Sequence, residues 1–141
     1  MEVNNMKRLN KKELLEYIDN LTTEQGNVTL SLRELVLAND VNVDERIIED
    51  KWLHGYIGYY SENNNLVYAI GALADGKTAF HMMPYYVNTG LQTKHAAALK
   101  KQMSGKSCIN IKTPDALDTK ALIDIMQDGA KTVDAAIAER R

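Results

Sequence analysis

Long apolar runs, cysteine and proline are all scarce in this sequence of 141 residues. No run of about 18 apolar residues is present and no apolar signal segment opens the chain, so neither a membrane span nor a secretory leader is expected. The single cysteine, Cys108, has no partner for an internal disulfide, which favours a reducing cytoplasm. The formal net charge of −2 gives no general attraction to nucleic acid backbones. The sequence therefore predicts one cytoplasmic domain over residues 1–141, with neither a membrane nor a nucleic acid as partner.

The hydrophobic periodicity that is present predicts an α+β fold, in which an antiparallel sheet of four to five strands packs against helices. Two helices are expected within residues 10–40, the first capped by Asn10 with Glu13 as its capping-box partner. Asp75-Gly76 is a strong hairpin signal between two of the expected strands. The expected strands lie at 56–60, 66–73, 77–82 and 107–112, with helices at 91–103 and 117–126 and a helical tail after Gly129.

The triplet Gly105-Lys106-Ser107 matches the end of a nucleotide-binding P-loop. A P-loop also needs a glycine five positions earlier, where this chain has Lys100, and it needs a strand before it and a helix after it. Here the expected order is reversed, with a helix before the triplet and a strand after it. Gly105 is therefore interpreted as the stop of a helix, although Lys106 and Ser107 remain candidates for contact with an anionic ligand.

Four features of the second half occur in a specific order. They are Trp52 before the first expected strand, the strand end "FHMMP", the segment "SGKSCINIK" and the acidic "PDALD" that follows it. In this order the segment from Lys51 to Met126 resembles the YdhG-like domain family, a bacterial family of unknown function with a frataxin-like α+β fold. The resemblance implies a non-enzymatic binding protein, a monomer or a homodimer.

The same resemblance implies a more concrete hypothesis, an iron chaperone that passes iron to an iron–sulfur assembly protein. No cofactor is certain, and iron is the one that this hypothesis names. The metal candidates are the carboxylates of "DERIIED", namely Asp44, Glu45, Glu49 and Asp50. Iron accepts carboxylate oxygen, and Glu45 and Glu49 would share one face if this stretch were helical. A solvated charged face is the simpler alternative.

A second hypothesis is a small-ligand or partner site on an aromatic sheet face, because tyrosines, Trp52 and methionines concentrate around the expected strands. Most of these aromatic residues are expected in the core or at its rim. The candidate ligand-binding residues are Trp52, Tyr59, His81, Met83, Lys106 and Ser107.

A third hypothesis is a thiol enzyme in which His81 acts as the base for Cys108. No third orienting residue or oxyanion element is evident, so an enzyme is favoured less than a binding protein and no catalytic residue is assigned. The three histidines, His54, His81 and His95, show no zinc-motif spacing and are expected to be packed or partly exposed.

Overall fold

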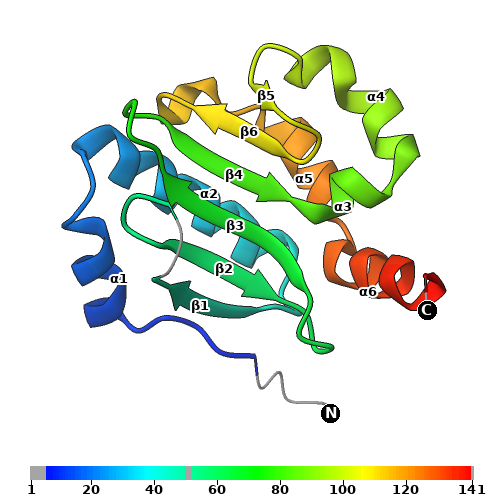
Figure 1. Cartoon of the computed structure of the whole chain (residues 1–141), viewed down its shortest axis with the longest axis horizontal. Coiled ribbons are helices and arrows are strands. Elements are labelled where there is room, and N and C mark those ends of the chain that lie inside the picture. Colours follow the sequence, from blue (N-terminus) through cyan, green and yellow to red (C-terminus); the bar gives the residue numbers. More distant parts are fainter. Residues whose placement is uncertain (1–5, 50–51, 141) are drawn as a thin grey trace.

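The computed structural model describes residues 6–49 and 52–140 and has an α+β architecture (Figure 1). Its centre is an open antiparallel sheet in the order β1-β2-β3-β4-β6-β5. The six strands are β1 Asp44–Ile48, β2 Tyr56–Tyr60, β3 Leu66–Ala72, β4 Thr78–Met82, β5 Met103–Ser104 and β6 Cys108–Ile111. The predicted α+β class is confirmed, whereas the predicted count of four to five strands is wrong because β1 and β5 were not recognised.

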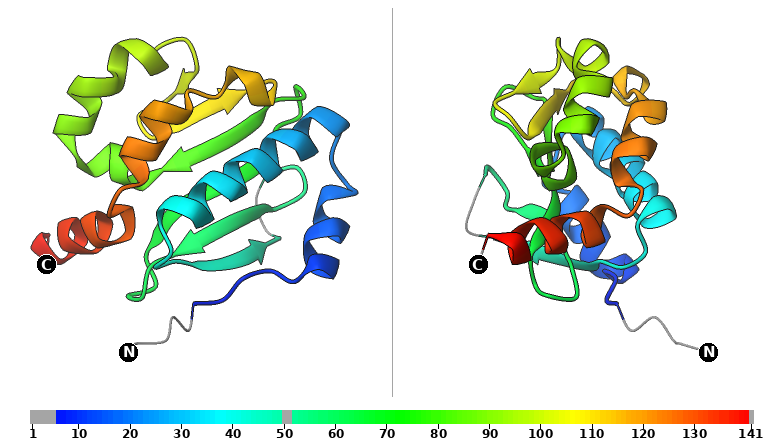
Figure 2. Two further views of the ribbon diagram at one scale, coloured as in Figure 1. Left: turned by 180° about the vertical axis from the view of Figure 1, so that it is seen from behind. Right: turned by 90° about the vertical axis from the view of Figure 1, so that its right-hand side faces the viewer.

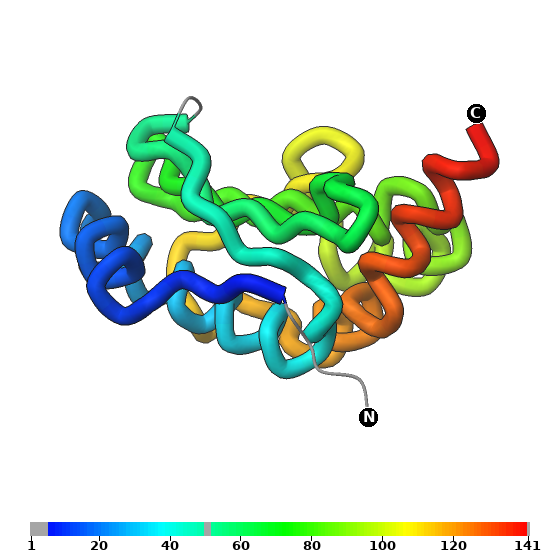
Figure 3. Tube along the Cα trace, turned by 90° about the horizontal axis from the view of Figure 1, so that it is seen from below, coloured from blue at the N-terminus to red at the C-terminus, as the bar shows by residue number. Residues whose placement is uncertain are grey.

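Helices α2 and α5 lie side by side on one face of the sheet, and within residues 6–49 and 52–140 no helix lies over the centre of the other face (Figures 2 and 3). The remaining helices pack around the edges and ends of the sheet. The helices are α1 Lys11–Ile18, α2 Thr23–Asn39, α3 Met83–Val87, α4 Thr89–Leu99, α5 Thr119–Met126 and α6 Gly129–Glu139, with a short 3-10 turn at Pro114–Ala116.

Capping side chains set the start of both N-terminal helices. Asn10 and Glu13 form the predicted capping box of α1, with Asn10 Oδ1 accepting from the Glu13 N–H at 2.8 Å. The second of the two helices expected within residues 10–40 begins at Thr23, because Thr22 and Gln25 form a second capping box. The Gln25 amide also donates to the carbonyls of Leu73 and Lys77, which ties α2 to the β3–β4 turn.

The chain between α4 and β6 differs from its prediction. Helix α4 ends at Leu99 rather than near Met103, and Met103–Ser104 pairs with β6 as a two-residue strand. Gly105 has φ +77° in the turn of this hairpin, so it makes a tight turn between strands and does not stop a helix. No helix follows the Gly-Lys-Ser triplet directly, which removes the geometry that a phosphate-binding loop needs.

The helix-covered face of the sheet forms the core. One row across it consists of Ile57, Ile70, Phe80 and Ile109, which are paired neighbours on β2, β3, β4 and β6 and are fully buried. Apolar side chains of α2 and α5 pack against this row, including Val28, Leu32, Val36, Leu122 and Ile125. Burial of this apolar surface is the main contribution that holds α2 and α5 on this face.

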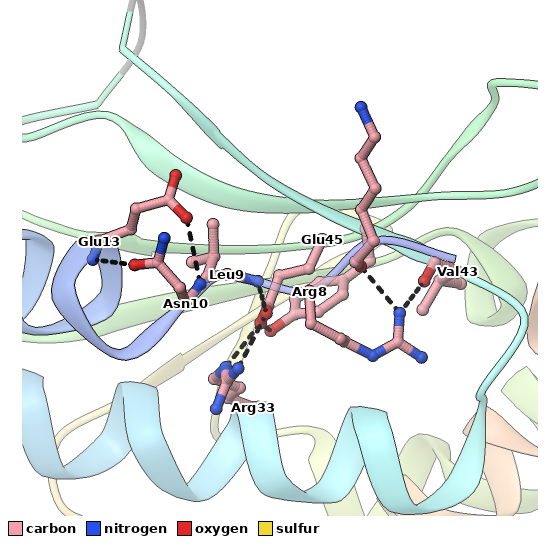
Figure 4. Close-up of polar contacts among 9 residues, drawn as sticks. Arg8, Leu9, Asn10, Glu13, Arg33, Val43 and Glu45 are labelled. Atoms are coloured by element: carbon pink, nitrogen blue, oxygen red, sulfur yellow. Dashed lines mark hydrogen bonds and ion pairs between the residues drawn. The ribbon is translucent and has the colours of Figure 1, made fainter. Parts of the chain in front are cut away.

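Glu45 is a buried carboxylate on the same covered face, only 3% exposed (Figure 4). Its oxygens accept hydrogen bonds from the Arg33 guanidinium at 2.7 and 3.0 Å and from the Tyr59 hydroxyl at 2.7 Å. The backbone N–H of Leu9 donates a further bond of 2.8 Å. Glu45 therefore joins the N-terminal segment, α2, β1 and β2 through one charged group.

A second buried carboxylate, Asp40 at the end of α2, holds the start of α6. Its Oδ2 accepts from the Tyr68 hydroxyl at 2.9 Å and from the Ala130 N–H at 3.0 Å. Burial raises the pKa of Asp40, and these hydrogen bonds oppose that rise. Gly129, the first residue of α6, lies directly against the Tyr68 hydroxyl and the Asp40 carboxylate.

Candidate functional site: the open face of the sheet

The open face is the side of the sheet that α2 and α5 do not cover. Its side chains alternate with those of the core along each strand, so the strand pairing defines it. One row contains Ile48, Tyr56, Gly71, Ala79 and Asn110, and the next contains Arg46, Gly58, Ala69, His81 and Cys108. Small residues occupy its centre, and aromatic and polar residues surround them.

Two strand glycines allow aromatic rings to lie directly on the backbone of the sheet. A Cβ on Gly58 would come within 2.8 Å of the Tyr60 ring and 3.0 Å of the Tyr56 ring, and a Cβ on Gly71 would overlap the Trp52 indole at its Cε3 atom. Glycine within a strand often marks such a close approach. The two glycines therefore make room for a layer of three rings.

Trp52 has the least usual geometry of the three aromatic residues. Its backbone φ is 58°, in a left-handed region that bulky residues rarely adopt. Its ring packs edge-on against Tyr56, with centroids 5.3 Å apart, and yet 39% of the residue stays exposed. The Cε3, Cζ3 and Cδ2 atoms of the indole lie against Gly71, and the exposed part of the residue is available to a ligand.

A cation already lies on this aromatic layer. The Arg46 guanidinium carbon is 4.3 Å from the centroid of the Tyr60 ring. Arg46 also donates to Asn64 at 2.7 Å and to Asp44 at 3.2 Å, which fixes its position over the ring. The layer thus binds a cation by the quadrupole of a tyrosine ring within its own fold.

Replacing Gly71 by alanine is expected to displace the Trp52 indole from the sheet, because the added methyl occupies the position of the ring. Trp52 is the only tryptophan, so its fluorescence emission reports the change directly. We expect a shift to longer wavelength, easier quenching by iodide, and a free energy of unfolding lowered by about 1–3 kcal/mol. Gly90→Ala on α4 is the matched control and should leave the emission unchanged. An unchanged emission in Gly71→Ala would contradict the placement of the indole.

At the other side of the open face, three polar atoms from β4 and from the start of β6 converge. His81 Nδ1 lies 3.1 Å from Ser107 Oγ and 3.4 Å from Cys108 Sγ, and the two latter atoms are 4.0 Å apart. Burial lowers the pKa of His81. It raises the pKa of Cys108, although the hydrogen bond with Ser107 partly offsets this. The thiol and the imidazole are therefore both stabilised in their neutral forms, which opposes a thiolate nucleophile.

The structure brings together part of the predicted ligand-binding set. Trp52, His81 and Ser107 lie on or beside the open face, and Lys106 is exposed in the β5–β6 turn. Tyr59 lies on the covered face, where it is fully buried against Glu45. Met83 begins α3 and packs, partly buried, on the core.

Sequence reasoning missed Arg46, Gly58 and Gly71 as parts of this face. The alternation along β2 could have identified Gly58, because Tyr56, Gly58 and Tyr60 point to one face of the sheet and Ile57 and Tyr59 point to the other. The position of Trp52 over Gly71 involves residues that do not pair in the sheet, and no local pattern encodes it.

The carboxylates predicted to bind iron are not on a helix, so they do not share the helix face that the iron-chaperone hypothesis assumed. Asp44–Ile48 is a strand, so Asp44 and Glu45 point to opposite faces, and Glu45 is bound by Arg33. The Lys7 N–H and Arg46 bind Asp44 and lower its pKa. Glu49 is exposed after the strand, and Asp50 lies outside the described residues. Across residues 6–49 and 52–140, no group of three or more His, Cys, Asp or Glu side chains is placed to hold a metal ion.

The other two histidines, His95 and His54, lie in different environments. His95 is buried on α4 and lies 2.7 Å from the Asp124 carboxylate of α5, so it joins two helices. His54 is exposed in the loop before β2. Neither contributes to the cluster around His81.

A separate hollow of about 490 Å³ lies where the β3–β4 turn meets the start of α2. Its lining mixes two lysines with two acidic side chains, so it has no dominant charge. The lining residues are Thr22, Glu24, Asp75, Gly76, Lys77, Lys112 and Thr113. It is the natural alternative to the open face in any binding experiment.

In the part of the chain that the structure describes, no helix combines the length and apolarity needed to cross a lipid bilayer. No family model matches the sequence, and neither a curated protein nor a solved structure is detectably similar to the chain.

Proposed function

We propose that this chain is a YdhG-like, non-enzymatic binding protein whose open face holds a planar or cationic group of a small ligand or of a partner protein. The observation that carries the proposal is Trp52, an aromatic residue that is 39% exposed and has a backbone φ of 58°. Left-handed geometry at a bulky residue costs of order 1–3 kcal/mol and is concentrated at binding and active sites.

The neighbours of Trp52 support the same proposal. Tyr56 and Tyr60 extend the aromatic layer, and their hydroxyl oxygens are 3.3 Å apart. Tyrosine and tryptophan combine a broad apolar ring with a polar edge, which suits them to contact with planar ligands. Arg46 over Tyr60 is an internal example of the cation contact that an external group would make.

The iron-chaperone hypothesis has less support, because Glu45 is committed to Arg33, Tyr59 and Leu9. The thiol-enzyme hypothesis has less support because burial opposes ionisation of Cys108. The order of Trp52, "FHMMP", "SGKSCINIK" and "PDALD" supports the family assignment, and an α+β fold with helices on one face agrees with it.

Binding of two probes by the full chain tests the proposal. Benzamidine is planar and cationic, and adenosine is planar and neutral. We expect measurable binding of at least one in ligand-observed NMR, and an approximately tenfold loss of affinity in Trp52→Ala, because stacking contributes about 1–3 kcal/mol.

Tyr86→Ala is the matched control, since Tyr86 on α3 is an aromatic residue with a similar exposure of 40%. It should leave the affinity unchanged. Equal losses in Trp52→Ala and Tyr86→Ala, or no loss in Trp52→Ala, would count against the open face.

A further inference from the structure

Ser107, His81 and Cys108 place three different donor atoms around one point on the open face. The three separations, 3.1, 3.4 and 4.0 Å, define a triangle whose circumscribed circle has a radius of about 2.1 Å. Zinc binds imidazole nitrogen at about 2.0–2.1 Å and thiolate sulfur at about 2.3 Å, and it binds carboxylate oxygen at about 2.0–2.2 Å, a separation that we take for the Ser107 hydroxyl as well. One point therefore lies at or just within bonding distance of all three atoms.

From this geometry we propose that His81 Nδ1, Cys108 Sγ and Ser107 Oγ form an open site for a thiophilic divalent cation of the zinc class. Soft thiolate and imidazole donors select zinc over magnesium or calcium. The site is distinct from the acidic stretch around Asp44, and it does not rest on ligand binding at the aromatic layer.

Hydrogen bonding already draws the three donor atoms toward one another. A neutral imidazole has one nitrogen lone pair, and both the Ser107 hydroxyl and the Cys108 thiol lie within reach of His81 Nδ1. The Ser107 hydroxyl and the Cys108 thiol also lie within hydrogen-bonding reach of each other at 4.0 Å, so the three groups form one connected cluster. A cation would bind to His81 Nδ1 and Cys108 Sγ through their lone pairs, with Ser107 Oγ as the third protein donor.

The position of the three residues determines what kind of site this is. His81 and Cys108 are paired neighbours on β4 and β6, so the sheet fixes their separation without a flexible loop. All three side chains are half-buried, so solvent or an external ligand can reach the cluster. Such an open site exchanges its metal or accepts an external ligand, whereas a closed four-ligand site is structural.

Binding requires no redox step. The Cys108 thiol loses its proton to solvent and its sulfur bonds to the metal, while His81 Nδ1 and the neutral Ser107 hydroxyl each donate a lone pair. Each of the three protein donors displaces at least one water molecule from the hydrated cation. One proton is therefore released for each cation bound through sulfur.

The test is anaerobic titration of the reduced, metal-free full chain with Co²⁺, followed by displacement with Zn²⁺. We expect a thiolate-to-cobalt charge-transfer band that saturates at one equivalent and is bleached by one equivalent of Zn²⁺. Cys108→Ser should abolish the band, and His81→Gln should weaken Zn²⁺ binding at least about tenfold, since even loss of an outer partner of a metal ligand costs 10–100-fold. His54→Gln is the matched control and should bind as the original chain does.

A measurement on the unmodified chain keeps the test independent of variant folding. Saturating Zn²⁺ should slow alkylation of Cys108 by iodoacetamide at least about tenfold, because the bound sulfur is no longer a free nucleophile. The proposal is wrong if no charge-transfer band forms, if the band persists in Cys108→Ser, or if Zn²⁺ leaves the alkylation rate unchanged. None of these results bears on benzamidine or adenosine at Trp52, so this inference and the proposed function fail separately.

Discussion

Glu45→Ala is expected to lower the free energy of unfolding by about 3–5 kcal/mol, the cost of breaking a buried ion pair by removing one partner. The substitution leaves the partly buried Arg33 guanidinium without its carboxylate, and it removes the acceptor of the Tyr59 hydroxyl and of the Leu9 N–H. Each of these donors then loses a charge-assisted hydrogen bond.

The Glu45 prediction is checked by urea unfolding of the full chain, with Asp44→Ala as the matched control. Asp44 is the preceding carboxylate on the same strand, but it faces the other side of the sheet and pairs with Arg46 near solvent. Its loss should cost about 1 kcal/mol or less. Similar decreases in the free energy of unfolding for the two variants would contradict the stabilising role given to Glu45 and its partners Arg33, Tyr59 and Leu9.

Gly129→Ala is expected to lower the free energy of unfolding by about 2–4 kcal/mol, through overpacking and the disruption of a buried hydrogen bond. A Cβ at Gly129 would overlap the Tyr68 hydroxyl and would lie 3.0 Å from both Asp40 Oδ2 and Pro84 Cγ. Tyr68 is fully buried and stacks on Phe80, so it cannot move aside without disturbing the core. Separation of Tyr68 from Asp40 would also weaken the hold on the start of α6.

Thermal or urea unfolding measures the Gly129 effect, and Gly90→Ala provides its control. Both glycines lie in the first turn of a helix, but Gly90 is exposed and its Cβ would meet only Asn88 Oδ1 at 3.1 Å. Alanine there should be neutral or stabilising by up to about 1 kcal/mol. Tyr68→Phe in the Gly129→Ala background should recover part of the loss, and strictly additive losses would argue against a clash with the hydroxyl.

Patterns with a local physical cause could be predicted from the sequence. The capping box of α1, the Asp75-Gly76 hairpin and the alternation of Ile109 and Ile111 with Cys108 and Asn110 all correspond to observed features. Strands β1 and β5 could not be recognised in the same way. Strand β1 begins with three charged residues, one of them the buried Glu45, and β5 is too short for any periodicity to register.

The open face was predictable only in outline. Sequence reasoning proposed an aromatic sheet face and placed Trp52 and His81 in it, but it also included Tyr59, which belongs to the core. Strand parity separates Tyr59 from Tyr56 and Tyr60, yet it does not tell which side the helices cover. That choice depends on long-range packing of α2 and α5, as does the position of Trp52 over Gly71.

The most direct test of the open face as a binding surface is protein-observed ¹⁵N NMR during titration with benzamidine and adenosine. Binding as proposed will shift the Trp52 indole N–H and the backbone amides of Gly58, Gly71 and His81, with little change elsewhere. Shifts centred instead on Thr22, Gly76 and Lys112 would place binding in the hollow beside α2. That result, or no localised shift with either probe, would contradict the proposed function.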